Sequence, residues 1–530
     1  MEAQSVITRF QNSGVFRTQG LIGGKWTEAY DGKTIQVHNP ATGEVIADVP
    51  CMGQPETNDA ISSAYEMFNS WSKVTAIERS QCLWKWHDLL IAHKEELGQL
   101  ITLEQGKPLN EAIIEVIIAA GYLEFFAEEA KHVYSDIIPS TVADCQLFVI
   151  KQPVGVVGAI TPWNFPLAML TSKVGPALAC GCTVVLEPSE LTPLIAFAAA
   201  GLALEAGIPS GALNVVTGNA PDIEHALLAS PKVRKITFTG LSAVEKKIMP
   251  GAGETLRKVS LEPGGNAPCI VFDDTDLGVA VKSILAVKFH NSGQTCISAN
   301  RILVQEGIYE KFATAFSKAV TSLQVGDGFC EGVTQGPLIN EAAVQTVESL
   351  VQDAISKGAK LLLGGKRHNL GMTFYEPTVI GDVNNKMLIS RNKICGPIAA
   401  LLRFKTEEEA ICIANDTDEG LAAYIFTKNL QRSWRVSEVL EYGLVGVSEG
   451  LIPTVMAPVS GFKNTGLGQE GSKKGMLEYL EVITRERVRN KWFCTIVIYS
   501  NVCRLALNNF VVCCKCLWFC VLVDGISSQA

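Results

Sequence analysis

The sequence predicts an α/β protein built on parallel sheets that are covered by helices. Short apolar runs lie at 147–157, 182–186, 213–216 and 235–239, and segments with helical patterning separate them. Strands that alternate with helices in this way form a parallel sheet. The chain has 530 residues, of which 47% are hydrophobic and 19% charged. It is therefore long enough for two or three domains with large cores.

The first half of the chain begins with helices. Thr75 and Glu78 stand at capping-box spacing, and helical patterning continues through Leu97 to about Tyr134. A later helix is predicted over 194–206, with Thr192 as its cap, Pro193 in its first turn and Gly207 at its end.

A ligand of such a sheet lies at the carboxyl ends of its strands. The residues that follow the predicted strands directly are Glu187 to Glu190, Gly218 and Gly240. A formal dinucleotide glycine pattern also occurs at 466–471. No strand-like run leads into it, so we interpret it as a chance match without a phosphate role.

Charge and cysteine content exclude several classes of protein. The net charge is -9 and no basic block occurs, which argues against nucleic acid or an anionic membrane surface as a partner. Ten of the 16 cysteines lie between Cys51 and Cys412, which suits a reducing compartment. Their spacings lack the paired pattern of a zinc site, so we predict no bound metal. Residues 1–18 are polar, so no secretory signal is predicted.

The last fifty residues or so differ from the rest of the chain. Between Trp492 and Val523 only Arg504 and Lys515 are charged, and the other six cysteines gather there. A membrane anchor, a mis-joined or read-through segment, and an ordered extension all fit this composition. We expect no membrane association unless this tail anchors the protein.

Two segments carry potential chemistry. Cys296 ends the run Asn-Ser-Gly-Gln-Thr-Cys, and Glu262 lies in Leu-Glu-Pro-Gly-Gly-Asn. A thiolate can add to an aldehyde carbon, and the adduct can lose hydride to give a thioester that a carboxylate-activated water hydrolyses. The pair therefore indicates an enzyme that oxidises an aldehyde.

The chain resembles the aldehyde dehydrogenase superfamily, most closely its plant-type succinate-semialdehyde dehydrogenases, over about residues 20–482. The resemblance rests on six segments in order: 161–166, 238–240, 262–266, 293–296, 336–338 and 420–424. It implies a variant Rossmann cofactor domain at 1–129 and 154–262 and an α/β catalytic domain at 263–465. It further implies a small β oligomerisation element at 130–153 and 466–485, followed by a non-family tail at 486–530.

The resemblance also implies catalytic roles. Cys296 matches the nucleophile, Glu262 matches the base for thioester hydrolysis, and Asn164 matches the side chain of the oxyanion hole. Lys173 and Glu470 match positions that the family associates with the proton network of the active site.

The implied cofactor is NAD, with NADP less favoured because Glu187 and Glu190 would repel a ribose 2′-phosphate. Two matched positions depart from the family: Glu187 stands where lysine is usual, and Lys393 where glutamate is usual. We expect weak cofactor binding, which Glu187→Lys and Lys393→Glu should improve. Leu241, Glu245 and Pro263 are further departures near the expected pyrophosphate and base. The cofactor-binding residues that we predict are Thr161, Pro162, Trp163, Glu187, Ser189, Glu190, Gly218, Thr239, Gly240 and Lys393.

The implied substrate is succinate semialdehyde, a small-molecule aldehyde. Two arginines of the family clamp its carboxylate, and Ser172 and His290 stand at the matching positions. An imidazolium does not reproduce the two-point grip of a guanidinium, so a weak grip on the substrate is expected. Ser298 stands where relatives often have a second cysteine, so no disulfide switch is proposed.

Two other functions stay open from the sequence. The chain could be a catalytically silent homologue that associates with active subunits, or a cofactor-free thiol esterase that uses Cys296 and Glu262. The resemblance implies a homo-oligomer, a tetramer in the family. It places the protein in the mitochondrial matrix, with the cytoplasm as the alternative because no clear targeting peptide is visible.

Overall fold

The computed structural model describes residues 14–143, 145–240, 242–254, 257–450 and 455–488. The chain divides into two compact units, the first made of residues 1–133 and 153–481 and the second of residues 134–152 and 482–530. The described part of the second unit contributes to a three-stranded sheet in the order β21-β6-β5, formed by Leu480–Val488, Cys145–Pro153 and Asp136–Pro139. Strand β21 continues past the boundary predicted at 485.

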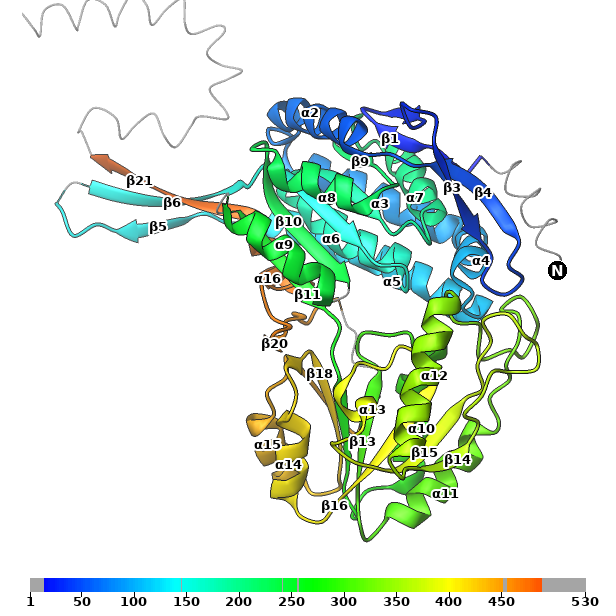
Figure 1. The fold of residues 1–530 in the computed structure, drawn as a ribbon. Coiled ribbons are helices and arrows are strands. Elements are labelled where there is room, and N and C mark those ends of the chain that lie inside the picture. The colour runs from blue at the N-terminus through cyan, green and yellow to red at the C-terminus, as the bar shows by residue number, and fades with distance from the viewer. Residues whose placement is uncertain (1–13, 144, 241, 255–256, 451–454, 489–530) are drawn as a thin grey trace, which may run out of the picture. The chain divides into compact units, whose positions relative to one another are not determined.

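The first unit contains two seven-stranded sheets, which Figure 1 shows in its upper and lower parts. The first sheet has the order β11-β10-β7-β8-β9-β1-β2. Its parallel strands are β11 (Lys258–Pro263), β10 (Val233–Gly240), β7 (Val156–Thr161), β8 (Thr183–Pro188) and β9 (Leu213–Val215). The hairpin β1 (Gly20–Ile22) and β2 (Lys25–Thr27) extends it antiparallel to β9. The predicted α/β fold with a parallel sheet is confirmed.

The predicted strand at 147–157 is in fact two strands, β6 and β7. Pro153 ends the first, and Gly155 adopts a φ of 129° before the second begins. Residues other than glycine rarely adopt this conformation, so Gly155 marks the break between β6 and β7. The periodicity of the apolar residues does not reveal the break.

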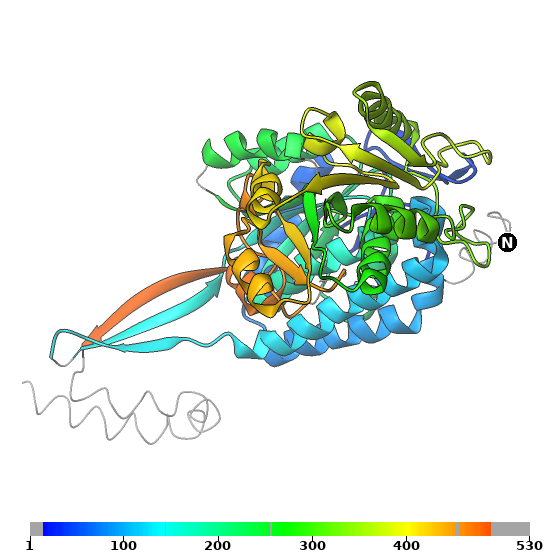
Figure 2. The ribbon, with the colours of Figure 1, turned by 90° about the horizontal axis from the view of Figure 1, so that it is seen from below.

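Helices cover this first sheet. The predicted tract after Thr75 is three helices, α3 (Ala76–Ala92), α4 (Lys94–Gln105) and α5 (Leu109–Glu129), which lie alongside one another (Figures 1 and 2). The capping box is present, because the Thr75 hydroxyl accepts from the Glu78 amide and the Glu78 carboxylate accepts from the Thr75 amide. Gly106 in the left-handed region and Pro108 separate α4 from α5.

Helix α7 (Leu194–Glu205) is capped by a residue that the local sequence does not reveal. The Thr192 hydroxyl, which we predicted as the cap, makes no hydrogen bond within the described residues. Instead the buried Glu104 carboxylate accepts from the Leu194 and Ile195 amides at 2.9 and 3.0 Å. The cap therefore comes from α4, and the prediction for Thr192 was wrong.

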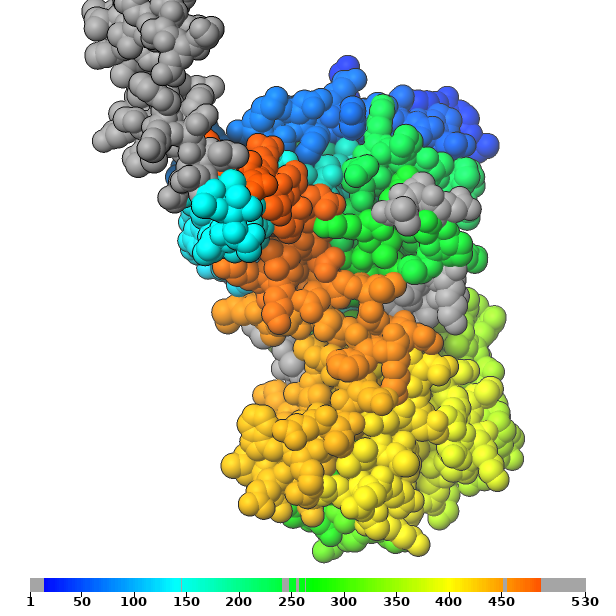
Figure 3. All heavy atoms as spheres, turned by 90° about the vertical axis from the view of Figure 1, so that its left-hand side faces the viewer, coloured from blue at the N-terminus to red at the C-terminus, as the bar shows by residue number. Residues whose placement is uncertain are grey.

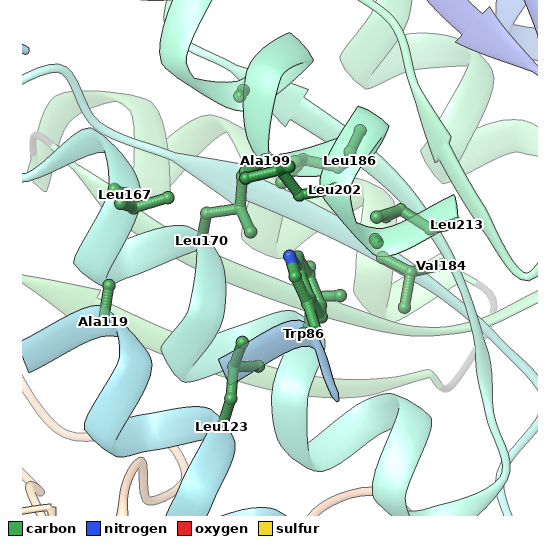
Figure 4. Close-up of a cluster of buried hydrophobic side chains, with 14 of the residues drawn as sticks. Trp86, Ala119, Leu123, Leu167, Leu170, Val184, Leu186, Ala199, Leu202 and Leu213 are labelled. Carbon is green, nitrogen blue, oxygen red and sulfur yellow. The ribbon is translucent and has the colours of Figure 1, made fainter. Parts of the chain in front are cut away.

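The core of this half gathers around Trp86, which is fully buried. Figure 4 shows its ring among side chains from α5, α6 (Pro166–Cys180), α7 and the strands β8 and β9. The labelled neighbours are Ala119, Leu123, Leu167, Leu170, Val184, Leu186, Ala199, Leu202 and Leu213. The packing of these elements fixes the strand ends that are described below. Two further helices of this half are α2 (Gln54–Trp71) and α8 (Ala220–Ala229).

The second sheet has the order β14-β15-β16-β13-β12-β18-β19. Its strands are Lys360–Leu363, Thr378–Val383, Ile398–Phe404, Ala299–Gln305, Ala267–Val271, Ala422–Phe426 and Leu444–Val447, and only β14 runs antiparallel to its neighbour. The main helices of this half are α10 (Leu277–Phe289), α11 (Tyr309–Val320), α12 (Glu341–Ser356), α14 (Glu407–Asn415) and α15 (Leu430–Val439). The yellow segments of this half gather in the lower part of the space-filling view (Figure 3). No helix among the described residues is long and apolar enough to cross a membrane.

Candidate active site

A cavity of about 400 Å³ lies at the carboxyl ends of β7, β8 and β10. This is the edge of a parallel sheet at which ligands bind. The cavity is lined by nearly all of the predicted cofactor residues, most of them at the strand ends, and by Cys296, Asn164, Gly264 and Cys395. The predicted cofactor residues that line it are Thr161, Pro162, Trp163, Glu187, Ser189, Glu190, Thr239, Gly240 and Lys393.

Three of these residues present buried polar atoms at the strand ends. Within the described residues, Thr161 Oγ1, Glu187 Oε2 and Thr239 Oγ1 have no hydrogen-bond partner. Unpaired buried polar atoms are costly, so a ligand rich in hydroxyl groups would complete this edge. The donor set fits the ribose groups of a dinucleotide. Burial, with Glu224 and Glu190 nearby, raises the pKa of Glu187 well above its usual value, so Glu187 can also be neutral and donate.

Cys296 follows a short turn with unusual backbone geometry. Asn291 and Ser292 have φ values of 50° and 54°, and Gly293 has 75°. Side-chain contacts hold this turn: the Glu111 carboxylate accepts from the Asn291 amide at 2.8 Å, and the Gln294 carboxamide accepts from the Ile339 amide at 3.0 Å. A side chain at position 293 would meet the Gly396 carbonyl oxygen, so only glycine fits there. Strained turns of this kind concentrate at functional sites.

The Cys296 thiol is in a partly buried environment with competing charges. Burial and the nearby Glu262 raise its pKa, whereas the Lys393 ammonium and the backbone amides of Cys296 and Ile297 lower it. Burial is the largest of these effects, so the pKa of the thiol stays above its usual value.

Asn164 directs its carboxamide toward the loop that carries the thiol. Its Nδ2 donates to the Gln294 carbonyl oxygen at 2.9 Å. The backbone carbonyl oxygen of Asn164 accepts from Lys107 Nζ at 2.8 Å and from Asn291 Nδ2 at 3.0 Å. Both the side chain and the backbone of Asn164 are therefore held in place.

Lys107 belongs to a buried network that the sequence did not indicate. Its ammonium pairs with the Glu115 carboxylate at 2.5 Å, and both side chains are fully buried. The same carboxylate accepts from the Leu167 and Ala168 amides in the first turn of α6. Glu115 thus links α5 to the start of α6, next to Asn164. No local sequence pattern around Lys107 or Glu115 predicts that the two side chains form an ion pair.

Glu262 lies at the end of β11 with one carboxyl oxygen unpartnered among the described residues. Burial and the adjacent Glu470 raise its pKa well above the usual value, although Lys173 acts in the opposite direction. Lys173 is fully buried and pairs with Glu470, whose carboxylate also accepts from Thr237 Oγ1 at 3.2 Å. The predicted Glu262, Lys173 and Glu470 are therefore close together.

Six predicted residues do not line the cavity: the neighbouring Glu262, Lys173 and Glu470, and also Ser172, His290 and Gly218. Ser172 is buried on α6 and donates to the Met169 carbonyl oxygen at 3.0 Å. His290 stacks on Phe165 with ring centroids 5.7 Å apart, and its Nδ1 lies 3.3 Å from Glu111. Gly218 packs against Met52, whose backbone a side chain at 218 would strike. The side chains of Leu241, Glu245 and Pro263 lie outside the described residues.

Lys393 and Cys395 also line the cavity. The Lys393 ammonium occupies the space beside Gly264, 1.8 Å from where a Cβ would stand. Ser298, close to the thiol in the chain, is buried and accepts from Lys288 Nζ at 3.1 Å. Lys288 is likewise buried, and this lowers its pKa to about 7. The sequence did not indicate that the Lys288 side chain is buried beside Ser298. Among the described residues, no group of His, Cys, Asp or Glu side chains could hold a metal ion.

Comparisons with known proteins agree with this geometry. The profile of the aldehyde dehydrogenase family matches residues 26–484. The chain is 70% identical to the mitochondrial succinate-semialdehyde dehydrogenase of Arabidopsis thaliana over 482 residues, which cover 91% of each chain. Among solved structures, it is similar to succinate-semialdehyde dehydrogenase from Burkholderia pseudomallei, with 47% identity, a TM-score of 0.89 and coverage of 90% and 99%. Betaine aldehyde dehydrogenase from Staphylococcus aureus in complex with NAD+ gives 33% identity, a TM-score of 0.89 and coverage of 92% and 98%.

Proposed function

The chain belongs to the aldehyde dehydrogenase family, whose members oxidise aldehydes with NAD(P), and from this premise we propose that it converts succinate semialdehyde to succinate with NAD. The observation that carries the proposal is the single cavity that joins the Cys296 thiol to the unpaired polar atoms at the strand ends. The identity of 70% to a plant succinate-semialdehyde dehydrogenase supports the choice of substrate.

In this proposal Cys296 is the nucleophile. Its thiolate adds to the aldehyde carbon and forms a thiohemiacetal whose oxygen carries the developing charge. The Asn164 carboxamide and the backbone amide of Cys296 donate to that oxygen. Each donor of this kind contributes about 3 to 4 kcal/mol to the transition state. The hydrogen bonds from Lys107 and Asn291 hold Asn164 ready for this role.

Glu262 is the base for hydrolysis of the thioester that follows hydride loss. It must be ionised to take a proton from water, and its raised pKa makes it a stronger base once ionised. Lys173 and Glu470 set the charge around Glu262, because Glu470 favours its protonated form and Lys173 its ionised form. We propose that these three residues control the transfer of the proton from the attacking water.

NAD supplies the hydride acceptor of this reaction when it is bound. Thr161, Glu187 and Thr239 would hold its ribose groups through their free polar atoms. We favour NAD over NADP because the carboxyl groups of Glu187, Glu190 and Glu224 line the cavity together, and each one that is ionised opposes a 2′-phosphate.

The grip on the substrate carboxylate differs from the two-arginine clamp of the family. His290 is the only candidate cation of the two matched positions, and Glu111 already lies beside it. We therefore propose weak discrimination between succinate semialdehyde and uncharged aldehydes of similar length. A charged clamp would instead favour the carboxylate strongly.

The organisation of the chain follows the same proposal. Residues 1–129 and 154–262 would bind the cofactor, and residues 263–465 would carry the thiol. The segments 130–153 and 466–485 would form the element through which copies assemble into a homo-oligomer. We propose the mitochondrial matrix as the compartment, because the Arabidopsis relative is described as mitochondrial.

A cofactor titration of the full chain tests this function. Protein fluorescence is followed as NAD is added, and NADH absorbance is then recorded with succinate semialdehyde. Saturable binding and NADH formation that Cys296→Ala abolishes would support the proposal. A folded protein that binds no NAD would favour the silent homologue, and ester cleavage without NAD that needs Cys296 would favour the esterase.

A further inference from the structure

Lys393 brings a positive charge into the cavity of the thiol. It lies between α13 (Leu388–Arg391) and β16 and lines the same cavity as Cys296 and Cys395. Its ammonium reaches the backbone of Gly264, so closely that a methyl group on Gly264 would collide with it. Gly264 follows Glu262 by two positions. The ammonium therefore lies close to the segment that carries the proposed base, in the cavity that the proposed nucleophile also lines.

This ammonium, on a half-buried side chain, differs from the buried cations of the site. Lys173 is paired with Glu470, and Lys107 with Glu115. Across the described ranges of the chain, no carboxylate forms an ion pair with Lys393. An unpaired ammonium in a confined cavity acts on the nearest group that can become negative.

The thiol is such a group. The titratable residues that act on Cys296 are Lys393 and Glu262, and the Tyr122 and Tyr424 hydroxyls lie within electrostatic reach of it. The two tyrosines are neutral at ordinary pH, because burial raises the pKa of each. Glu262 disfavours a thiolate when it is ionised, and burial raises the pKa of Glu262, which favours its protonated form. Lys393 is the only side chain of this set that favours the thiolate.

We propose that Lys393 stabilises the Cys296 thiolate and so offsets part of the effect of burial on the nucleophile before any cofactor binds. The inference rests on the proposed function only in taking Cys296 as the nucleophile. It assigns Lys393 an electrostatic task at the thiol, in addition to any contact with the cofactor. A lysine beside a cysteine lowers the thiol pKa in the same manner elsewhere.

The test measures the ionisation of the thiol directly. Full-length protein without cofactor is treated with iodoacetamide, a neutral alkylating agent, at a series of pH values. The rate of modification of the peptide that carries Cys296 is followed by mass spectrometry. The variants are Lys393→Gln, Lys393→Glu and Lys393→Arg, and Lys366→Gln is the control because Lys366 is exposed and does not line the cavity.

We expect Lys393→Gln to raise the apparent pKa of Cys296 by about one unit, which lowers the alkylation rate near neutral pH about tenfold. Lys393→Glu should raise it further, whereas Lys393→Arg and the control should keep the original profile. A purely structural role of Lys393 would change the stability of the protein but not this pH profile. An unchanged profile in folded Lys393→Gln and Lys393→Glu protein would overturn the inference.

The outcome is independent of turnover with NAD. If the protein forms no NADH but its Cys296 profile still depends on Lys393, the proposed function fails and the electrostatic role stands. If NADH forms normally and the Cys296 profile is the same in the Lys393 variants, the proposed function stands and the electrostatic role fails.

Discussion

Lys173 on α6 and Glu470 near the end of the chain form a buried ion pair, although 297 positions separate them in the sequence. Ser172 and Thr237 also direct their hydroxyls to the Glu470 carboxylate, at 3.5 and 3.2 Å. The pair brings a charged carboxylate next to Glu262 and so contributes to the raised pKa of that residue. The pair thus connects the packing of α6 to the proton chemistry of the site.

Lys173→Met should strongly destabilise the protein. It leaves the Glu470 carboxylate buried without its cation, which costs about 3–5 kcal/mol in free energy of unfolding. Urea denaturation of the variant and the parent measures this loss. The double variant Lys173→Met, Glu470→Met is the control, because it removes both charges and should be less destabilised than the single one. An equal or larger loss in the double variant would contradict the pairing.

Glu262→Gln should separate the two halves of the reaction. The thiol can still add to the aldehyde and the first NADH can form, but the thioester then lacks a base for its hydrolysis. We expect a burst of NADH close to one equivalent of enzyme and a steady-state rate lowered by about 10²–10⁴. Stopped-flow absorbance measures both phases. Steady turnover at the parent rate would show that another group activates the water.

Asn164→Ala should lower kcat by about 10²–10³, because one donor to the developing oxyanion is lost. The substrate KM should change little if the carboxamide acts mainly in the transition state. Steady-state kinetics with succinate semialdehyde provide both constants. Asn164→Asp is a useful companion, since its negative charge should be more harmful than the alanine. A loss confined to KM would place Asn164 in ground-state binding instead.

Glu187→Lys should strengthen cofactor binding. It replaces a carboxyl group at the end of β8 by an ammonium that can donate to ribose hydroxyls and attract phosphate. The gain should be larger for NADP, because its 2′-phosphate carries additional negative charge. Fluorescence titrations with NAD and NADP measure the two dissociation constants. If neither constant falls, the charge at 187 does not limit cofactor affinity.

The lowered pKa of Lys288 predicts that the stability of the protein depends on pH. Its ordinary pKa is 10.5, and burial lowers it to about 7 in the folded protein. Between these values the unfolded chain binds a proton that the folded protein does not, so stability increases with pH through this window. The contribution of Lys288 should therefore rise from pH 7 upward, by at most about 1.4 kcal/mol per pH unit.

The free energy of unfolding of the parent and of Lys288→Met is measured by denaturation between pH 6 and pH 9. The difference between the two proteins isolates the contribution of Lys288, because the contributions of the other titrating groups cancel. Lys282→Met is the matched control, because Lys282 lies on the same helix but is exposed. A constant difference between the parent and Lys288→Met across the range would mean that Lys288 stays charged in the folded protein.

Much of the fold and part of the site could be predicted from local sequence. The alternation of apolar runs and helical segments predicted the parallel sheet, and the spacing of Thr75 and Glu78 predicted a capping box that the structure contains. The strand-end residues Glu187 to Glu190 and Gly240 followed from the same pattern and line the cavity, whereas Gly218, which also followed from it, does not. Such features depend on neighbours within a few residues, so a sequence reveals them.

Other features depend on residues that only tertiary packing brings together. Glu104 caps α7 from another helix, Lys107 holds Asn164 from the connection between α4 and α5, and the Lys393 ammonium enters the space that Gly264 leaves open. Long-range contacts leave no periodic signal, because the partners are far apart in the chain and each alone has an ordinary local context. By itself the sequence determined the order of the elements and the positions of the thiol and the carboxylate. The tertiary structure decided which charges surround them, since a charge acts through distance in space and not through separation along the chain.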